Sequence, residues 1–368
     1  MKRAIPIMLA LCLLLSGCSG WLDSHYQSVT PHEEPFAQPE TENVSVSNYT
    51  QLCQTLRTLV ESGAEKGIIS IARYDQKQVQ TDVNKAVKEI MKTDPVAAYA
   101  VEDIAYEFGA NAGQYAVAVT ISYLHGRSEI QKIQRVADLQ EAKTVLSDTM
   151  NKCNSGIVLY VDAFEELDFE QWVSDYAAEN PDLVMEVPAV SASVYPEEGE
   201  ARVVELRFAY QNSRESLRLM QSKVSILFDA AAIYAGEEGD TAERYFKLYS
   251  FLMGLFQTYQ LDSSLTPAYS LLQHGVGDTK AFATVYAAMC EKAGLECIVV
   301  TGMRAGEARY WNMVLVDDIY YHVDLLACEH NDEFKMQTDV EMRDGGEMTG
   351  YVWDYQAYPV CGIKQPEE

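Results

Sequence analysis

The sequence passes from a glycine-containing segment into an apolar helix at Gln273-His274-Gly275-Val276-Gly277-Asp278-Thr279-Lys280-Ala281-Phe282-Ala283. We expect Asp278 or Thr279 to cap this helix, because short oxygen-bearing side chains satisfy the free N–H groups at a helix start. The helix continues through Met289 and Cys290 and ends at Gly294-Leu295-Glu296. The other elements of the C-terminal third are arranged on either side of it.

Strands are predicted after this helix, and another helix is predicted before it. The strands run from Cys297 to Thr301, from Tyr310 to Val316 and from Ile319 to Asp324, with a tight turn at Asp317-Asp318. Apolar residues at three- and four-residue spacing predict a helix from about Thr241, namely Tyr245, Leu248, Leu252, Leu255 and Phe256. A helix packed against an antiparallel sheet gives an α+β fold class.

The order of these motifs resembles the transglutaminase-like family, whose core is papain-like. Its members carry Gly-Val-Cys-x-Gly-Tyr-Ala at the start of the central helix, then a strand with His-Ala-Trp-Asn-x-Val, then a strand ending Trp-Tyr-x-Val-Asp. The resemblance covers roughly Tyr245 to Cys361, and Tyr351-Val352-Trp353-Asp354 with Tyr358-Pro359 is similar to the family's usual ending. It implies a transglutaminase-like domain over residues 236–368.

The resemblance places different residues at two of the family's three catalytic positions. Thr279 lies four residues before the Ala that closes the first motif, where the family has its nucleophilic cysteine. Arg309 stands in the place of the histidine, and Asp324 keeps the family identity. A guanidinium stays protonated and cannot act as a base, so this set is predicted to be inert in acyl transfer. We expect Arg309 to form a forked ion pair with Asp324 instead.

Cys328 is the best candidate for a substitute nucleophile. It follows Asp324 by four residues and has His322 and His330 nearby, but nothing places it at a helix start. The Cys328-x-His330 pair also lacks the ligand count of a zinc site. We therefore expect no catalytic residue, no metal and no cofactor.

The remaining cysteines are expected to be structural. Cys290 lies about three turns into the helix and should point into the core, and Cys297 opens a buried strand. Six cysteines follow the signal segment, which is not a disulfide-dense framework. If one disulfide forms, we expect it to join Cys328 to Cys361.

The first eighteen residues have the features of a secretory signal. Lys2 and Arg3 form a charged region, residues 4–15 are apolar, and Leu15-Ser16-Gly17-Cys18 follows. The tetrapeptide resembles the lipobox of bacterial lipoproteins, which implies that Cys18 is lipidated and anchors the chain to the membrane on its extracytoplasmic side. An ordinary secretory signal is the alternative. Residues 19–47 are rich in Ser, Thr, Glu, Gln and Pro and predict a disordered tether.

An internal duplication is predicted between the tether and the C-terminal domain. The strand-like segments Gly67–Tyr74 and Gly156–Ala163 are similar, and each is followed by matching helix, turn and Tyr-x-x-x-Arg landmarks. We assign two β-α-β-β-α units to residues 48–136 and 137–235. In the first unit an apolar stripe predicts one helix face: Ile130, Ile133, Val136 and Ala137.

Composition limits the partners of the chain. Its 368 residues include 55 acidic and 28 basic residues, which gives a net charge of -27. Duplex binding requires clustered positive charge, and no basic run follows Arg3, so nucleic acid is an unfavourable partner. The sequence leaves the oligomeric state open.

Two classes of function follow from these observations. The first is a surface-tethered, non-catalytic receptor or scaffold that binds peptide, cell-wall or glycan ligands, with a purely mechanical spacer as a variant. Its expected contacts are Tyr310, Asp278, Tyr321 and Trp311, although Trp311 is equally expected as a core residue. The second is an active cysteine peptidase or transglutaminase-type acyltransferase, in which either the alignment of the motifs given above is displaced or Cys328 is the nucleophile.

Overall fold

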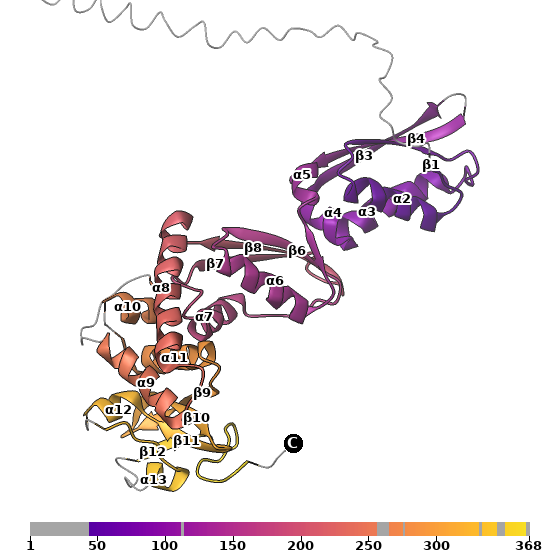
Figure 1. The fold of residues 1–368 in the computed structure, drawn as a ribbon. Coiled ribbons are helices and arrows are strands. Elements are labelled where there is room, and N and C mark those ends of the chain that lie inside the picture. Colours follow the sequence, from indigo (N-terminus) through magenta and orange to yellow (C-terminus); the bar gives the residue numbers. More distant parts are fainter. Residues whose placement is uncertain are drawn as a thin grey trace, which may run out of the picture. The chain divides into compact units, whose positions relative to one another are not determined.

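The structure is a computed structural model that describes residues 44–111, 114–255, 265–274, 277–330, 333–343 and 350–365 (Figure 1). The chain has the α+β class predicted from its sequence, with three four-stranded sheets among the described residues. The signal segment and Cys18 lie outside these residues. None of the helices within them is long and apolar enough to cross a membrane.

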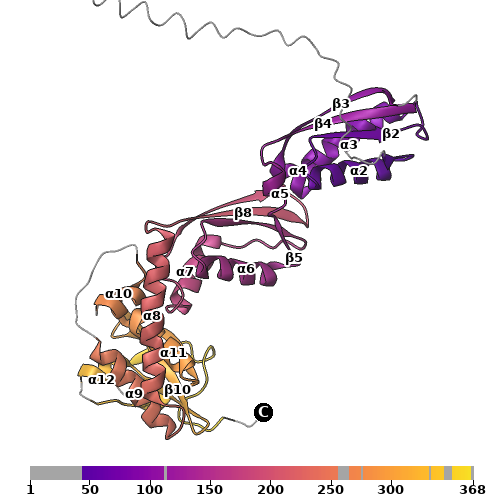
Figure 2. The same cartoon turned by 45° about the horizontal axis from the view of Figure 1, so that its top comes forward.

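The first sheet has the strand order β1-β2-β4-β3, with its helices on one face (Figures 1 and 2). Its strands are β1 (Val44–Ser45), β2 (Lys66–Ser70), β3 (Val101–Asn111) and β4 (Gln114–Tyr123). The helices are α2 (Tyr49–Glu61), α3 (Val79–Thr93), α4 (Pro95–Ala100) and α5 (Arg127–Ile130). Apolar side chains of the strands and helices form one core, which includes Leu52, Leu56, Ile69, Val83 and Val117.

The second sheet repeats this order as β5-β6-β8-β7. Its strands are β5 (Gln134–Val136), β6 (Gly156–Val161), β7 (Ala189–Tyr195) and β8 (Arg202–Ala209). The helices are α6 (Leu139–Asn151), α7 (Phe169–Glu179) and α8 (Arg214–Ala235). The shared strand order supports the predicted duplication. Each unit also contains an initial short strand and helix, β1-α2 and β5-α6, that the sequence did not reveal.

Two sequence predictions are wrong at the edges of these sheets. The predicted tether extends to residue 47, but Val46 is buried in the first core and its N–H donates to Ser70 O. The predicted helix stripe through Ile133 and Val136 is also incorrect, because α5 ends at Ile130 and β5 pairs with β6 in the second sheet. Strands of two or three residues are too short to show an alternating pattern.

The C-terminal region packs helices against an antiparallel sheet of order β11-β10-β9-β12. The strands are β9 (Cys297–Arg304), β10 (Glu307–Val316), β11 (Ile319–Val323) and β12 (Tyr351–Trp353). The helices are α9 (Thr241–Gly254), α10 (Pro267–His274), α11 (Thr279–Lys292), α12 (Leu325–His330) and α13 (Asp339–Arg343). Both residues of the turn Asp317-Asp318 have positive φ, as a two-residue hairpin requires.

Alternation along β10 and β11 separates two cores. Val314 and Val323 pack with α8, α9, α10 and α11 in the larger core. Trp311 and Met313 pack with Tyr351 and Trp353, among others, in a smaller core. Because neighbouring side chains of a strand point to opposite faces, the two cores lie on opposite faces of the sheet.

Candidate functional site

The start of α11 meets β10 at the position expected for the family's nucleophile. Asp278 caps the helix, and its Oδ1 accepts a hydrogen bond from Ala281 N at 2.8 Å, as predicted. Thr279 Oγ1 accepts from Tyr310 N at 3.3 Å, which holds the hydroxyl against the strand. Thr279 is therefore a link between helix and sheet.

Asp324 receives hydrogen bonds from four donors. Arg309 donates from Nε to Oδ2 at 2.8 Å and from Nη2 to Oδ1 at 2.7 Å, which is the forked pair that the sequence predicts. Ala327 N donates to Oδ1 at 3.0 Å, and Tyr351 Oη donates to Oδ2 at 2.8 Å. The Tyr351 contact was not foreseen, because this residue lies 27 positions further along the chain.

The electrostatics of this site keep its charges fixed. Burial alone would lower the pKa of Arg309, but its hydrogen bonds to Asp324 and the charge of that carboxylate raise it overall. Burial and the neighbouring Asp324 raise the pKa of Tyr351 as well. Arg309 therefore stays cationic and Tyr351 stays a neutral donor over the ordinary pH range, so neither can accept a proton from Thr279.

Thr279 is partly exposed, but the pocket beside it is too small for a water molecule. The lining of this pocket includes Phe282, Tyr310, Asp324 and Leu325. A bound water needs roughly 10–15 Å³ of such space, so the pocket holds no substrate group in the described conformation. Asn312 of β10 links the strand to the helix, because its Nδ2 donates to Ala283 O of α11 at 2.9 Å.

Cys328 does not have the surroundings of a nucleophile. Its side chain is buried, and Sγ makes two hydrogen bonds to the backbone of Lys335. It accepts from Lys335 N at 3.3 Å and donates to Lys335 O at 3.8 Å. Burial raises the pKa of Cys328, which disfavours the thiolate. Cys290 is fully buried, as predicted, and Cys297 opens β9 and is partly exposed.

The expected disulfide between Cys328 and Cys361 is wrong, because both thiols are free. Cys328 packs in the core that contains α11, whereas Cys361 packs with Trp311 on the opposite face of the sheet. The sheet therefore lies between the two sulfur atoms. Their sequence spacing gave no indication of this separation.

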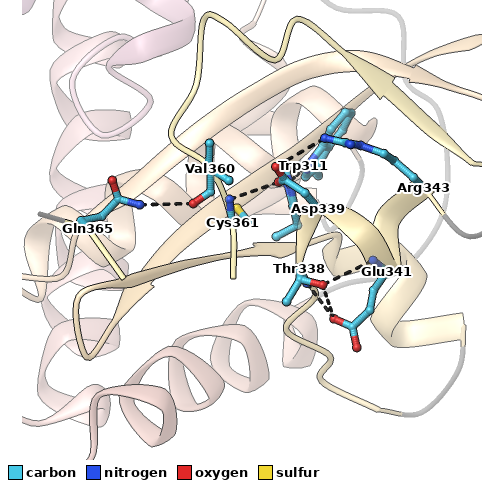
Figure 3. A network of polar contacts seen from close by, with 9 residues as sticks. Trp311, Thr338, Asp339, Glu341, Arg343, Val360, Cys361 and Gln365 are labelled. Atoms are coloured by element: carbon cyan, nitrogen blue, oxygen red, sulfur yellow. Dashed lines mark hydrogen bonds and ion pairs between the residues drawn. The ribbon is translucent and has the colours of Figure 1, made fainter. Parts of the chain in front are cut away.

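A second polar network lies on the face of the sheet opposite α11 and is centred on Asp339. His322 Nε2 and Asp339 Oδ1 are 3.0 Å apart, and Cys361 N donates to the same oxygen at 3.2 Å. Figure 3 shows Cys361 and Arg343 approaching the Asp339 carboxylate from different sides, and the Arg343 contact is 3.5 Å. Burial lowers the pKa of His322, and burial together with the charge of Asp339 raises that of Cys361.

The ligand atoms of His322, Asp339 and Cys361 lie within 4.8 Å of one another, close enough to suggest a metal site. The hydrogen bonds indicate a different role. Trp311 Nε1 can only donate, and it donates to His322 Nδ1 at 2.9 Å, so the ring proton must sit on Nε2. A metal ion at Nε2 would have to displace that proton. The arrangement instead fits a chain of hydrogen bonds, which we call the relay, in which Trp311 donates to His322 and His322 donates to Asp339.

The predicted ligand contacts divide into buried and accessible residues. Trp311 is 1% exposed, so its predicted role in ligand binding is wrong and it belongs to the core beside Tyr351. Tyr321 packs against the larger core, and Asp278 is occupied as the helix cap. Of the four residues, only Tyr310 lines an open groove.

This groove has a volume of about 730 Å³ and begins beside the closed Thr279 site. It runs between α7, α11 and β9, and its lining includes Thr284, Ala288, Cys297, Val299 and Thr301. The acidic residues Asp175, Glu179 and Glu291 line it together with a single lysine, Lys280. Glu296 also belongs to the lining, but its carboxylate accepts a hydrogen bond from Tyr320 Oη. Lys280 Nζ lies 5.6 Å from the centre of the Tyr310 ring. The groove therefore presents net negative charge.

One family model matches part of the C-terminal region. The family model of the transglutaminase-like superfamily matches residues 230–325. The crystal structure of a TGase is similar over 68% of this chain and 71% of its own, with 11% identity and a TM-score of 0.28. That of a "Putative Cysteine Protease from Cytophaga hutchinsonii" is similar over 45% and 71%, with 10% identity and a TM-score of 0.26. No curated protein matches the chain. The chain thus carries a transglutaminase-like domain, an assignment that rests on the family model.

Proposed function

We propose that the protein is an extracytoplasmic bacterial lipoprotein, anchored to the membrane through lipidated Cys18, with a catalytically inactive transglutaminase-like domain. The domain acts as a receptor or scaffold for peptide, cell-wall or glycan ligands. The observation that carries the proposal is the forked bond of Arg309 to Asp324 at the place of the family's His and Asp. A permanent cation there leaves Thr279 without a base.

The inactive state is tested by chemistry at the cysteines and at the degenerate site. Full-length protein is treated with iodoacetamide at pH 6 and at pH 8, and modified residues are identified by mass spectrometry. We expect only slow labelling of Cys297 and no cysteine that reacts at pH 6. Rapid modification of Cys328, or hydrolysis of a test peptide that is lost on Arg309→Ala, would contradict the proposal.

The groove beside Tyr310 supports binding of a cationic ligand. Opposite charges attract across such a surface, and the acidic residues of its lining outnumber its one lysine. A peptide with free amino groups meets this requirement, whereas a neutral glycan gains nothing from the net charge of the groove. We therefore rank amine-bearing peptides, including those of the cell wall, above uncharged sugars as ligands.

An array of lysine-containing peptides, acetylated peptides and neutral glycans tests this ranking. We expect retention of the amine-bearing peptides and several-fold weaker binding by Glu291→Gln. The matched control is Glu215→Gln, which alters an exposed carboxylate of α8 outside the groove. If Glu291→Gln and Glu215→Gln bound the peptides equally well, the groove would not be the binding site.

Anchoring is tested separately by metabolic labelling with a fatty acid and by cell fractionation. We expect Cys18→Ser to abolish the label and to release the chain from the membrane fraction. If the Cys18→Ser variant kept the label, another residue would carry the lipid and this part of the proposal would be wrong.

A further inference from the structure

Two cysteines flank the turn between α11 and β9. Cys290 lies in the last turn of α11, and Cys297 is the first residue of β9. The chain reverses between them in a Schellman turn, in which Gly294 N donates to Glu291 O at 2.9 Å and Leu295 N donates to Cys290 O at 2.8 Å. Gly294 has a φ of 70°, the left-handed conformation that this turn requires. Leu295 is thereby held against the helical turn that carries Cys290, and Cys297 follows two residues later.

The register of the sheet turns Cys297 toward α11. Cys297 pairs with Val314 of β10, and residues directly opposite each other in an antiparallel pair point to the same face of the sheet. Val314 is fully buried in the larger core. Cys290 is buried in that core as well, and Cys297 packs against it. Both thiols therefore lie between the helix and the sheet.

The thiols of Cys290 and Cys297 also interact with each other. Burial and a side-chain hydrogen bond with Cys297 raise the pKa of Cys290. The other buried cysteines of the described chain have no second thiol among the groups that shift their pKa, namely Cys53, Cys153, Cys328 and Cys361. The turn between α11 and β9 thus brings together two thiols that are suited to react with each other.

From the turn, the strand register and the shared core we infer that Cys290 and Cys297 form a disulfide when the chain meets a disulfide oxidant. The oxidant is a small-molecule or protein disulfide. Both thiols are free in the described structure, which is therefore the reduced state. Because the two residues already pack in one core, the bond forms without a change of fold.

The order of reaction follows from exposure. Cys297 reacts first, because it is partly exposed and lines the groove beside Tyr310, whereas Cys290 is buried. The Cys297 thiolate attacks one sulfur of the oxidant, and the other sulfur leaves and takes up a proton. Cys290 then loses its proton and attacks Cys297 Sγ, which releases the rest of the oxidant as a second thiol. The chain loses two hydrogen atoms and the oxidant gains them.

The disulfide joins two parts of the groove wall. Glu291 in the last turn of α11 and Cys297 of β9 both belong to the lining. The bond fixes the separation of these two segments. After oxidation, Cys297 no longer presents a free thiol to a ligand in the groove.

Controlled oxidation of the full chain tests the pair. Detergent-solubilised chain is reduced, incubated with oxidised glutathione at pH 8, blocked with N-ethylmaleimide and digested with trypsin. Cleavage after Lys292 separates the two cysteines, so the disulfide should join peptides 281–292 and 293–304. We expect this linked pair, lighter by two hydrogen atoms than the sum of its peptides, and loss of the slow alkylation of Cys297. A chain in which Cys297 keeps glutathione, or bonds to a different cysteine, would overturn the inference.

Two alanine variants distinguish this pair from oxidation in general. Cys290→Ala and Cys328→Ala each remove a buried thiol from the larger core. In Cys290→Ala, glutathione should stay on Cys297 as a mixed disulfide, whereas Cys328→Ala should form the linked peptides as the wild type does. Equal accumulation of the mixed disulfide in the wild type and in Cys290→Ala would contradict the pairing. If Cys290→Ala does not fold, the peptide map of the wild type still decides the question. The reaction needs neither the lipid anchor nor a ligand, so its failure would not bear on the proposed function.

Discussion

The C-terminal sheet carries one polar network on each face, and the two networks differ in the residue types that they contain. Thr279, Arg309 and Asp324 form the first network, at the positions that the sequence resemblance assigns to the family's catalytic residues, and this network has neither a thiol nor an imidazole. Cys361, His322 and Asp339 are the residue types of a cysteine-protease triad, but they are buried on the opposite face of the sheet from α11. A nucleophilic cysteine depends on a helix start and an open cleft, and neither network combines these features with a thiol.

The networks also differ in how they hold charge. Arg309 carries a permanent cation, and its Nη2 lies 2.7 Å from Asp324 Oδ1. His322 is fully buried and its pKa is lowered by burial, so its network is held together by a neutral ring. The comparison predicts large effects when the permanent pair is broken and smaller, pH-dependent effects when the neutral relay is changed.

Breaking the ion pair should have the largest effect. Asp324→Ala leaves the Arg309 guanidinium, whose side chain is 19% exposed, without its partner. We expect the free energy of unfolding to fall by about 3–5 kcal/mol, the cost of an uncompensated, largely buried charge. Urea unfolding followed by tryptophan fluorescence measures it.

Lys364→Ala is the control for this change. Asp318 pairs with Lys364 at 3.3 Å, but both side chains are more than 60% exposed. Such pairs contribute about 0–1 kcal/mol, so this variant should unfold almost as the wild type does. Similar losses in the two alanine variants would mean that Arg309–Asp324 is no more structural than a surface pair.

Removing the donor to His322 should have the next largest effect. Trp311→Phe keeps most of the ring volume but leaves His322 Nδ1 buried without a hydrogen bond. An unsatisfied buried acceptor costs about 1–3 kcal/mol, and we expect a loss of stability in that range. Trp172→Phe, a partly buried ring stacked on Tyr176, is the control. If Trp311→Phe left both the tautomer of His322 and the free energy of unfolding unchanged, the hydrogen bond from Trp311 would not be what fixes the His322 ring.

Restoring the family residues tests whether position alone can confer reactivity. In a Cys297→Ser background, Thr279→Cys with Arg309→His should place an imidazole near a thiol at the start of α11. Both the histidine and the helix N-terminus lower a thiol pKa, so we expect about tenfold faster alkylation near pH 7 than for Thr279→Cys alone. Equal rates would indicate that the closed packing, and not residue type, now prevents the chemistry.

The first network was largely predictable from the sequence. Local motifs fixed the register of α11 and β10 and hence the pairing of Arg309 with Asp324. The contribution of Tyr351 was not predictable, because it depends on how β12 returns to pair with β9. Trp311 was assigned to a ligand surface, but alternation along β10 points it into the core on the far side.

The second network was not foreseen at all. His322, Asp339 and Cys361 lie on three separate segments that no short motif connects. Only the tertiary fold brings them together, and only the donor chemistry of Trp311 assigns the tautomer of His322. Short-range patterns thus predicted the pairing of Arg309 with Asp324 but not the network around Asp339.

Titration of His322 should give the smallest effect and distinguish the two networks most directly. Burial lowers the pKa of folded His322 below the ordinary value of 6.5, so the unfolded chain binds the proton more readily. The stabilising contribution is therefore complete above about pH 6.5 and is lost as the pH falls toward the folded value. One such group changes the stability by at most about 1.4 kcal/mol per pH unit.

The measurement is urea unfolding of the wild type and of His322→Gln between pH 4.5 and 8. Other acidic groups titrate in both proteins, so the difference between the two curves isolates the histidine. We expect the wild type to lose stability more steeply than the variant below pH 6.5 and the two curves to run parallel above it. His125→Gln, which changes a partly exposed ring, should keep the wild-type slope. If the slope survives in His322→Gln, the relay is not the acid-sensitive element, and the contrast with the permanently charged Arg309 pair does not hold.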